Sequence, residues 1–477
     1  MSAAAAVRRF EPAKVQGNIL RGYRYKRVRY LMLEVTDVAT TRRWLGATVT
    51  PGSGAPAITT EVQWTVKPDT CFNLAVTYPG LRALGVPKAS LASFPTEFVQ
   101  GMNSRAVKVG DTGPSAPEHW ATPFNEPGKL HLIASIYAND IAHLDRVEQQ
   151  VTATSANAFS TLGVRDGWCF DGDTVHFGYR DNISEPRFEG IHDPDQTPDA
   201  QPMSPLGAML MGYPTEYEGL MWNVPEPDAL GSNGSFNAFR VLAQDVAGFE
   251  AYLSEAARNL LADPLGPELL PPGEEARIGP GLSRHAALRE IVAAKMCGRW
   301  RNGVPLALSP ETPNPDAPVS LTDFDYSGGA SCPFGAHIRR CNPRGGTIVQ
   351  RAARHTRRLV RRGTPYGPAF DPANPDSEER GLLGNFLCAN LGAQFEALAC
   401  DWMNLGLQDP RITGSNDPLL GANTVDTSWL DIPLPSGSVI RLRGLPRFVR
   451  TRGGAYTFLP GLPAIRYLAA LGDGRAS

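Results

Sequence analysis

Strand-like and helix-like segments alternate along this chain, and the whole alternation occurs twice. In the first half, strands are expected at residues 29–35, 71–76 and 129–137, each followed by a helical pattern that begins at 40, 79 or 141. Two further strands are expected at 164–170 and 175–179. The second half repeats the pattern, with strands at 208–213, 235–242, 357–361 and 382–387 and helices at 246–261, 286–296 and 394–403. This repetition predicts an α+β fold of two related halves, each an antiparallel sheet with helices on one face.

The length of 477 residues also favours two domains, because a single hydrophobic core rarely organises more than about 250–300 residues. The chain has 46 Lys and Arg against 48 Asp and Glu, a net charge of -2. Such balance gives no electrostatic reason to expect nucleic acid or an anionic membrane as a partner. No apolar run reaches the roughly 18 residues of a membrane helix, so we expect no membrane segment.

The seven cysteines are odd in number and widely spaced, without a CxxC pair, which favours reduced thiols over a zinc site or a disulfide framework. Arg8 and Arg9 form a twin-arginine pair, but polar residues follow it where an export signal needs an apolar stretch. We therefore expect a cytoplasmic location. The eight histidines contain no HxH or HExxH pattern, which ranks a metal hydrolase last among the possible functions.

A first candidate segment is the loop at residues 176–190, HFGYRDNISEPRFEG. It is rich in turn-forming residues, and such loops can hold a carboxylate at the wall of a pocket. Asp181 is the carboxylate in question. The same pattern also fits an Asx turn with a solvated side chain, so both interpretations stay open.

A second segment, residues 331–344 (SCPFGAHIRRCNPR), places His337 ahead of several arginines. A histidine here could ligate a metal or a haem iron, or it could be structural. The arginines are Arg339, Arg340 and Arg344. They are either a surface patch or partners for carboxylates such as haem propionates, which suit bidentate guanidinium contacts.

A third segment, residues 355–367 (HTRRLVRRGTPYG), ends in a turn. Neighbouring side chains of a strand point to opposite faces, so either Arg361 or Arg362 would point into a pocket and the other away from it. The alternative is an exposed basic edge strand.

In this order, the three segments resemble those of the dye-decolorizing peroxidase family. Residues 15–23 (VQGNILRGY) and 448–468 (FVRTRGGAYTFLPGLPAIRYL) are similar to its opening and closing segments. The resemblance spans nearly the whole chain and is closest to the long subgroup. It implies two ferredoxin-like halves, at residues 1–205 and 206–477, with haem b held between the sheet and the helices of the second.

The resemblance also implies roles for individual residues. His337 matches the proximal ligand of the haem iron, Asp181 the distal acid and Arg361 the distal arginine, with Arg362 as the outward neighbour of Arg361. Further haem contacts are expected from Asn182, Ser184 and Arg344. A carboxylate behind His337 would be Asp417 or Glu396, and we favour Asp417.

The distal loop departs from the family pattern at two positions. Asn182 stands where the family usually has Gly, and Glu185 where it usually has Gln. Asn tolerates a positive φ, so the turn can survive, but its side chain could narrow the distal pocket.

The implied activity is a haem b peroxidase that reduces hydrogen peroxide and oxidises a small phenolic or dye-like substrate in one-electron steps. Asp181 would move the peroxide proton, and Arg361 would stabilise the charge on the leaving oxygen. Because the reference pKa of Asp is about 3.9, we expect an acid pH optimum. The alternatives are a haem- or iron-handling protein with little turnover, and a non-catalytic scaffold or shell cargo of the same fold.

Overall fold

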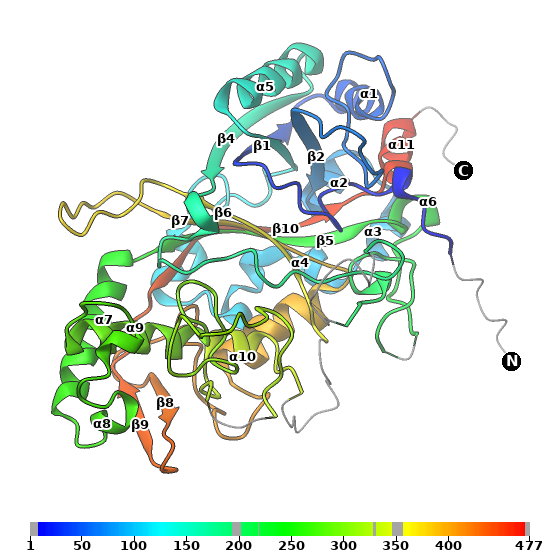
Figure 1. Cartoon of the computed structure of the whole chain (residues 1–477). Helices are drawn as coiled ribbons and strands as arrows, with labels where there is room; N and C mark the ends of the chain where they lie inside the picture. Colours follow the sequence, from blue (N-terminus) through cyan, green and yellow to red (C-terminus); the bar gives the residue numbers. More distant parts are fainter. Residues whose placement is uncertain (1–7, 193–201, 218, 328–330, 346–355, 473–477) are drawn as a thin grey trace, which may run out of the picture.

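The computed structural model describes residues 8–192, 202–217, 219–327, 331–345 and 356–472. Among these residues, eight strands form one antiparallel sheet in the order β4-β1-β3-β2-β10-β5-β7-β6 (Figure 1). The first four are β1 (Arg27–Val35), β2 (Thr70–Val76), β3 (Leu132–Ala138) and β4 (Phe159–Trp168). The other four are β5 (Ser235–Gln244), β6 (Val360–Tyr366), β7 (Gly381–Cys388) and β10 (Val449–Leu459).

Each half of this sheet has the same topology. If the strands of a half are numbered along the chain, their spatial order is fourth, first, third, second, which is the order of a ferredoxin-like fold. The halves meet where β2 lies beside β10, at the pair Val76 and Phe458. The prediction of two ferredoxin-like α+β halves is confirmed. A boundary at residues 205 and 206 stays a prediction; it falls in the connection between β4 and β5.

Helices cover the sheet of each half (Figure 1). Those of the first half are α1 (Val38–Thr48), α2 (Tyr78–Ala83), α3 (Lys88–Ala92), α4 (Thr96–Ser104) and α5 (Ile141–Ser155), and α11 (Leu462–Ala470) packs on α1. Those of the second half are α6 (Asp228–Gly231), α7 (Val246–Ala262), α8 (Gly266–Leu269), α9 (Arg284–Cys297) and α10 (His337–Cys341). A hairpin of β8 (Trp429–Pro433) and β9 (Val439–Arg443) lies near α8.

The long helices begin where a short polar side chain caps them. Asp140 Oδ1 accepts a hydrogen bond from His143 N at the start of α5, and Asp245 Oδ1 accepts one from Gly248 N at the start of α7. Apolar residues at helical spacing then face inward. Phe249, Leu253 and Leu260 of α7 share the core of α9, β8 and β9. This packing explains why periodicity located both helices correctly.

Two strand predictions are wrong. Residues 175–179 form a turn, closed by a hydrogen bond from Val175 N to Tyr179 O, with Gly178 at a φ of 80°. The apparent alternation came from Phe177 and Tyr179, which pack into the core of α7 and α9. Residues 208–213 form turns after a short 3₁₀ helix at Leu206–Ala208. The spacing of hydrophobic residues cannot tell which structure a short, buried apolar run adopts.

The helix predicted at 394–403 is present with a different geometry. Two π-helical segments, Leu391–Glu396 and Leu398–Asn404, follow one another there. Wide turns of this kind are rare and occur mostly at functional sites. The second segment contributes Leu398 and Met403 to the cavity described below.

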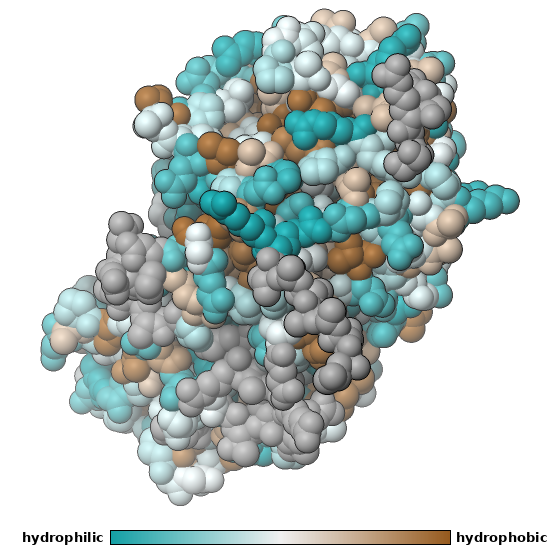
Figure 2. All heavy atoms as spheres, turned by 90° about the vertical axis from the view of Figure 1, so that its right-hand side faces the viewer, coloured by the Kyte–Doolittle hydropathy of each residue, from teal (hydrophilic) through white to brown (hydrophobic). Residues whose placement is uncertain are grey.

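All seven cysteines are free thiols. No helix in the described part of the chain is long and apolar enough to cross a bilayer. The face shown in Figure 2 is mostly hydrophilic, and its hydrophobic residues lie in small separate groups.

A buried ion pair ties the first half to the sheet of the second. Arg240 of β5 is 7% exposed and donates from Nη1 and Nη2 to the two oxygens of Asp111, each at 2.6 Å. Thr451 of β10 donates to Asp111 at 2.5 Å and accepts from Arg240 at 2.8 Å. The side chains of Arg240 and Asp111 are only 9% and 3% exposed, so each charge depends on the other for its stability.

We therefore predict that Arg240→Met lowers the free energy of unfolding by about 3–5 kcal/mol, because it leaves the Asp111 carboxylate buried without its partner. The double variant Arg240→Met/Asp111→Asn should lose clearly less. Urea denaturation followed by circular dichroism measures both. Equal losses in the single and double variants would show that the carboxylate is not held by the arginine.

Candidate functional site

A large cavity lies against the sheet of the second half. Its empty space, open mouth included, is about 1580 Å³. Alternate residues of two neighbouring strands line it. They are Arg361 and Gly363 of β6 and Leu382, Gly384 and Phe386 of β7. Further walls come from the loop at 175–184, the end of α9, α10 and the second π-helical segment.

His337 begins α10 and lines this cavity. Its Nδ1 lies 2.9 Å from Asp417 Oδ2, and the Asp417 side chain is fully buried. The second oxygen, Oδ1, accepts hydrogen bonds from Leu419 N and Leu420 N, each at 2.9 Å. Asp417 is therefore an acceptor that fixes the tautomer and the orientation of the imidazole ring.

The charges of this pair stabilise each other. Burial raises the pKa of Asp417, but the His337 ring and the Arg340 guanidinium offset this and hold the pKa below its ordinary value. Burial lowers the pKa of His337, whereas Cys341 and Asp417 raise it, and the net shift is upward. An ion pair that shares its remaining hydrogen bonds with backbone amides can persist in the interior.

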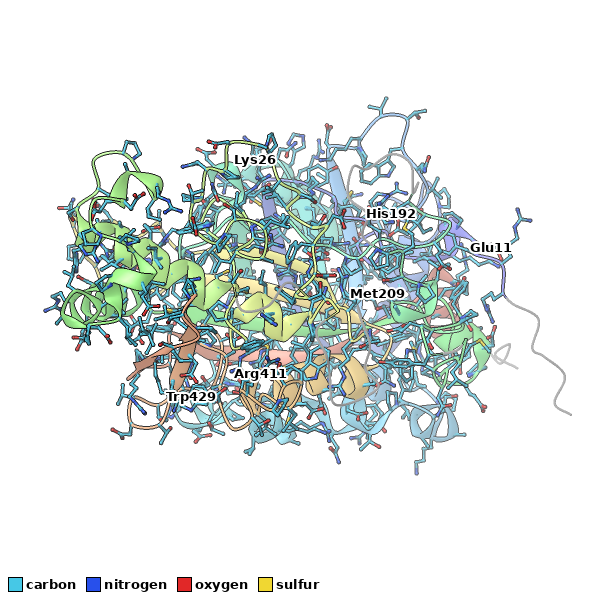
Figure 3. All side chains as sticks on the ribbon, turned by 60° about the horizontal axis from the view of Figure 1, so that its bottom comes forward. Glu11, Lys26, His192, Met209, Arg411 and Trp429 are labelled. Atoms are coloured by element: carbon cyan, nitrogen blue, oxygen red, sulfur yellow. The ribbon has the colours of Figure 1, made fainter. Side chains whose placement is uncertain are left out.

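Arg340 supports the backbone around His337 and Asp417 through hydrogen bonds. It is 1% exposed and donates to the carbonyls of Gly335, Trp402 and Ser415. Gly335 lies close to Leu430 and Ile412, so the segment before His337 sits between the β8 hairpin and the loop that leads to Asp417. Figure 3 shows Arg411 of that loop and Trp429 of the hairpin on the same side of the molecule.

Arg339 and Arg340 are not the surface patch that the sequence allowed. Arg339 is 7% exposed and donates to the carbonyl of Cys332, so both guanidinium groups support the backbone. Arg344 differs from them because it lines the cavity and donates to Ser184 Oγ at 3.0 Å.

Asp181 and Arg361 lie together in the same cavity. Arg361 Nη1 is 3.6 Å from Asp181 Oδ1, and Arg361 Nη2 is 3.6 Å from Glu185 Oε1. Glu185 also accepts hydrogen bonds from Arg361 N at 3.2 Å and from Arg362 Nη1 at 3.1 Å. Burial lowers the pKa of Arg361, but the two carboxylates raise it above its ordinary value.

The alternation of β6 determines which arginine faces the cavity. Arg361 and Gly363 line it, whereas Arg362 donates to the carbonyls of Asn18 and Ile19 in the first half. Asn182 adopts a φ of 57°, and among the described residues it is not one that lines the cavity. The expected narrowing by its side chain is therefore not observed.

Glu396 makes its contacts elsewhere and not with His337. It is fully buried, pairs with Arg105 and Lys108, and accepts from Tyr456 Oη at 2.9 Å. These partners use both of its oxygens. Of the two carboxylates considered from the sequence, Asp417 is the one that contacts His337.

The cavity carries a strong excess of positive charge. Its described lining includes the guanidinium groups of Arg180, Arg299, Arg344, Arg357, Arg358 and Arg361, against the single carboxylate of Asp181. Burial lowers the pKa of Arg299 and of Arg358 to about 10. Arg299 donates to the carbonyls of Gly303 and Leu321. Apolar walls with this excess of cations suit a large ligand that carries carboxylates.

Several contributors were not identified from the sequence. Cys341 lies one helical turn after His337, and its Sγ is 3.9 Å from each ring nitrogen. The spacing of four residues could have indicated this contact. Arg299 and Arg358 had no such local signal, because only the folded chain brings them into the lining of this cavity. His355, which opens the third segment, lies outside the described residues.

Known proteins have a similar sequence and fold. Residues 14–168 match the family model described as the DyP dimeric alpha+beta barrel domain. A dye-decolorizing peroxidase of Mycena epipterygia is 29% identical, over 96% of this chain and 86% of its own length. The multifunctional dye peroxidase DyP2 of Amycolatopsis sp. is 28% identical, over 95% of each chain.

A solved structure of a dye-decolorizing peroxidase in complex with 2,6-dimethoxyphenol superimposes with a TM-score of 0.77 at 26% identity, and covers 97% of this chain and 100% of its own. The similarity in sequence and in structure extends over almost the full length of the relatives, and the topology of both halves agrees with it. The family model over residues 14–168, the relatives over most of the chain and the solved structure together support membership of the dye-decolorizing peroxidase family.

Proposed function

We propose that this peroxidase binds haem b in the cationic cavity, with His337 as the ligand of the haem iron, and uses hydrogen peroxide to oxidise phenolic or dye-like substrates. The observation that carries the proposal is the contact of His337 Nδ1 with the buried Asp417, in a cavity that also holds Asp181 and Arg361. With Nδ1 engaged, Nε2 is the ring nitrogen left to bind a metal.

The donor set fits haem. With iron in place of the proton on Nε2, His337 would be an imidazole backed by a carboxylate, which is a common axial ligand. The propionates of haem require cationic partners such as Arg344. Leu382, Phe386 and Leu420 provide apolar walls for a macrocycle. When bound, haem supplies the redox-active iron that splits peroxide and takes electrons from the reducing substrate one at a time.

Asp181 and Arg361 would handle the peroxide itself. The Asp181 carboxylate accepts a proton from one peroxide oxygen and returns it to the other, so that water can leave. The Arg361 guanidinium stabilises the negative charge that develops on the leaving oxygen. Glu185 holds Arg361 from its other side, which keeps the guanidinium beside Asp181.

Two alternatives have less support. The alternative of a haem-handling protein without turnover depended on the Asn182 side chain narrowing the distal pocket. Asn182 is not among the described residues that line the cavity. A scaffold would give no reason for a buried carboxylate behind His337. The cytoplasmic location remains our proposal, and the seven free cysteines are in keeping with a reducing compartment.

The first test replaces the proposed proton carrier. Asp181→Asn should lower the rate of the reaction with hydrogen peroxide by about 10²–10⁴-fold, because the amide cannot accept the proton. Glu185→Gln is the matched control: it also removes a carboxylate beside Arg361 but should lose far less. Stopped-flow absorption of the haem-loaded variants measures both. A similar loss in both variants would argue for a general electrostatic effect and against Asp181.

A second test addresses the carboxylate behind the ligand. Asp417→Asn can keep an oxygen for the amides of Leu419 and Leu420 but loses the charge that makes His337 more basic. We expect activity to fall by about 10–100-fold and the iron reduction potential to rise. Spectroelectrochemistry measures the potential. Asp409→Asn is the control, because Asp409 lies in the same loop and pairs with Arg411. An unchanged potential in Asp417→Asn would remove Asp417 from this role.

A further inference from the structure

A second cavity lies on the far side of α9 from the proposed haem site. Residues of α9, of α8 and the turn after it, and of the loop that follows β8 enclose it, and its empty space, open mouth included, is about 1210 Å³. These elements lie together at one end of the molecule (Figure 1). None of its lining residues belongs to the cavity of His337.

Lys295 is the cation inside this cavity. It is 6% exposed on a stretch of α9 whose neighbours are Ala293, Ala294, Met296 and Cys297. Within the described residues, Nζ makes one hydrogen bond, to the carbonyl of Ser331 at 3.0 Å, and it forms no ion pair. The undescribed residues beside Ser331, 328–330, are Gly-Gly-Ala and carry no ionisable side chain. An ammonium group has three donors, so two remain for a ligand.

The surroundings of Lys295 explain why an anion would bind there. Burial lowers the pKa of Lys295, and the neighbouring Cys332 thiol, whose own pKa burial raises to about 12, offsets this only in part. Taking an ammonium group out of water without a counter-charge is costly, and an anion that enters the cavity would offset that cost. A carboxylate can accept both remaining N–H groups.

The remaining lining defines what else the ligand must carry. The apolar part of the walls is formed by Leu270, Ile278, Ile291, Pro433 and Leu434. The rim holds Glu268 and Glu311, and Arg277 at the rim is already paired with Glu311 and Glu274. These rim acids would repel a ligand with several negative charges. One negative charge on an apolar body fits the cavity best.

We propose that this cavity is a binding site for a monocarboxylate with an apolar tail, held by Lys295. The site also connects to the proximal side of the proposed haem pocket. Ser331, whose carbonyl receives the Lys295 hydrogen bond, begins the segment that leads to His337. A ligand carboxylate at Nζ therefore acts on the chain six residues before the iron ligand.

The test is a calorimetric titration of the haem-loaded protein with octanoate. We expect one site, with acetate and 1-octanol binding at least tenfold more weakly because one lacks the tail and the other the charge. Lys295→Met should weaken octanoate at least tenfold, Lys295→Arg should retain it, and Lys88→Met, at an exposed lysine of α3, should leave it unchanged. Unchanged affinity in Lys295→Met, or equal binding of 1-octanol, would overturn the proposal.

A second measurement needs no variant. Crystals of the haem-loaded wild-type protein soaked with 8-bromooctanoate should show an anomalous bromine peak between Ile291 and Leu434, with the carboxylate at Lys295. The haem cavity is also cationic, so the soak distinguishes the two sites directly. A peak only in the haem cavity, or none at a concentration that saturates the titration, would contradict the site.

Discussion

The buried contact between His337 and Asp417 is the interaction on which the rest of the site depends. A fully buried carboxylate is stable only if its partners replace water, and here they are an imidazole nitrogen, two backbone amides and the nearby charge of Arg340. The loop that carries Asp417 is fixed in turn by the hydrogen bond from Asp417 N to Met403 O. The ring orientation, the π-helical segment and the loop therefore form one unit, and a change in any of them would move the proposed iron ligand.

The sheet fixes the other proposed groups. Side chains of β6 alternate between its two faces, so Arg361 and Gly363 face the cavity while Arg362 contacts the first half. This one strand therefore both positions a proposed catalytic group and joins the two halves. Glu185 accepts from both arginines and connects the loop of Asp181 to this strand. The two halves of the sheet have the same topology, and the cavity lies against the second, where α9 and α10 line it together with the loop at 175–184.

Much of this was predictable from local patterns, and the errors have physical causes. Helices with polar caps and a clear apolar stripe, such as α5 and α7, were found because their signals are local. The segment at 175–179 was misread because Phe177 and Tyr179 are buried by contacts with distant helices, and Gly178 allows the turn between them. His337, Asp181 and Arg361 were found as members of a recognisable set of segments. Arg299 and Arg358 and the second cavity at Lys295 could not be found in this way, because they depend on which elements pack together.

The central claim is that His337, oriented by Asp417, ligates a haem iron that reacts with peroxide. The most direct test is the absorption spectrum of the haem-reconstituted protein and of His337→Ala, before and after one equivalent of hydrogen peroxide, with and without added imidazole. The wild type should show a Soret band that peroxide changes within the mixing time. His337→Ala should show a weaker or displaced band with little response to peroxide, and imidazole should restore both by occupying the space of the deleted ring. A His337→Ala spectrum and peroxide response equal to those of the wild type would contradict the account.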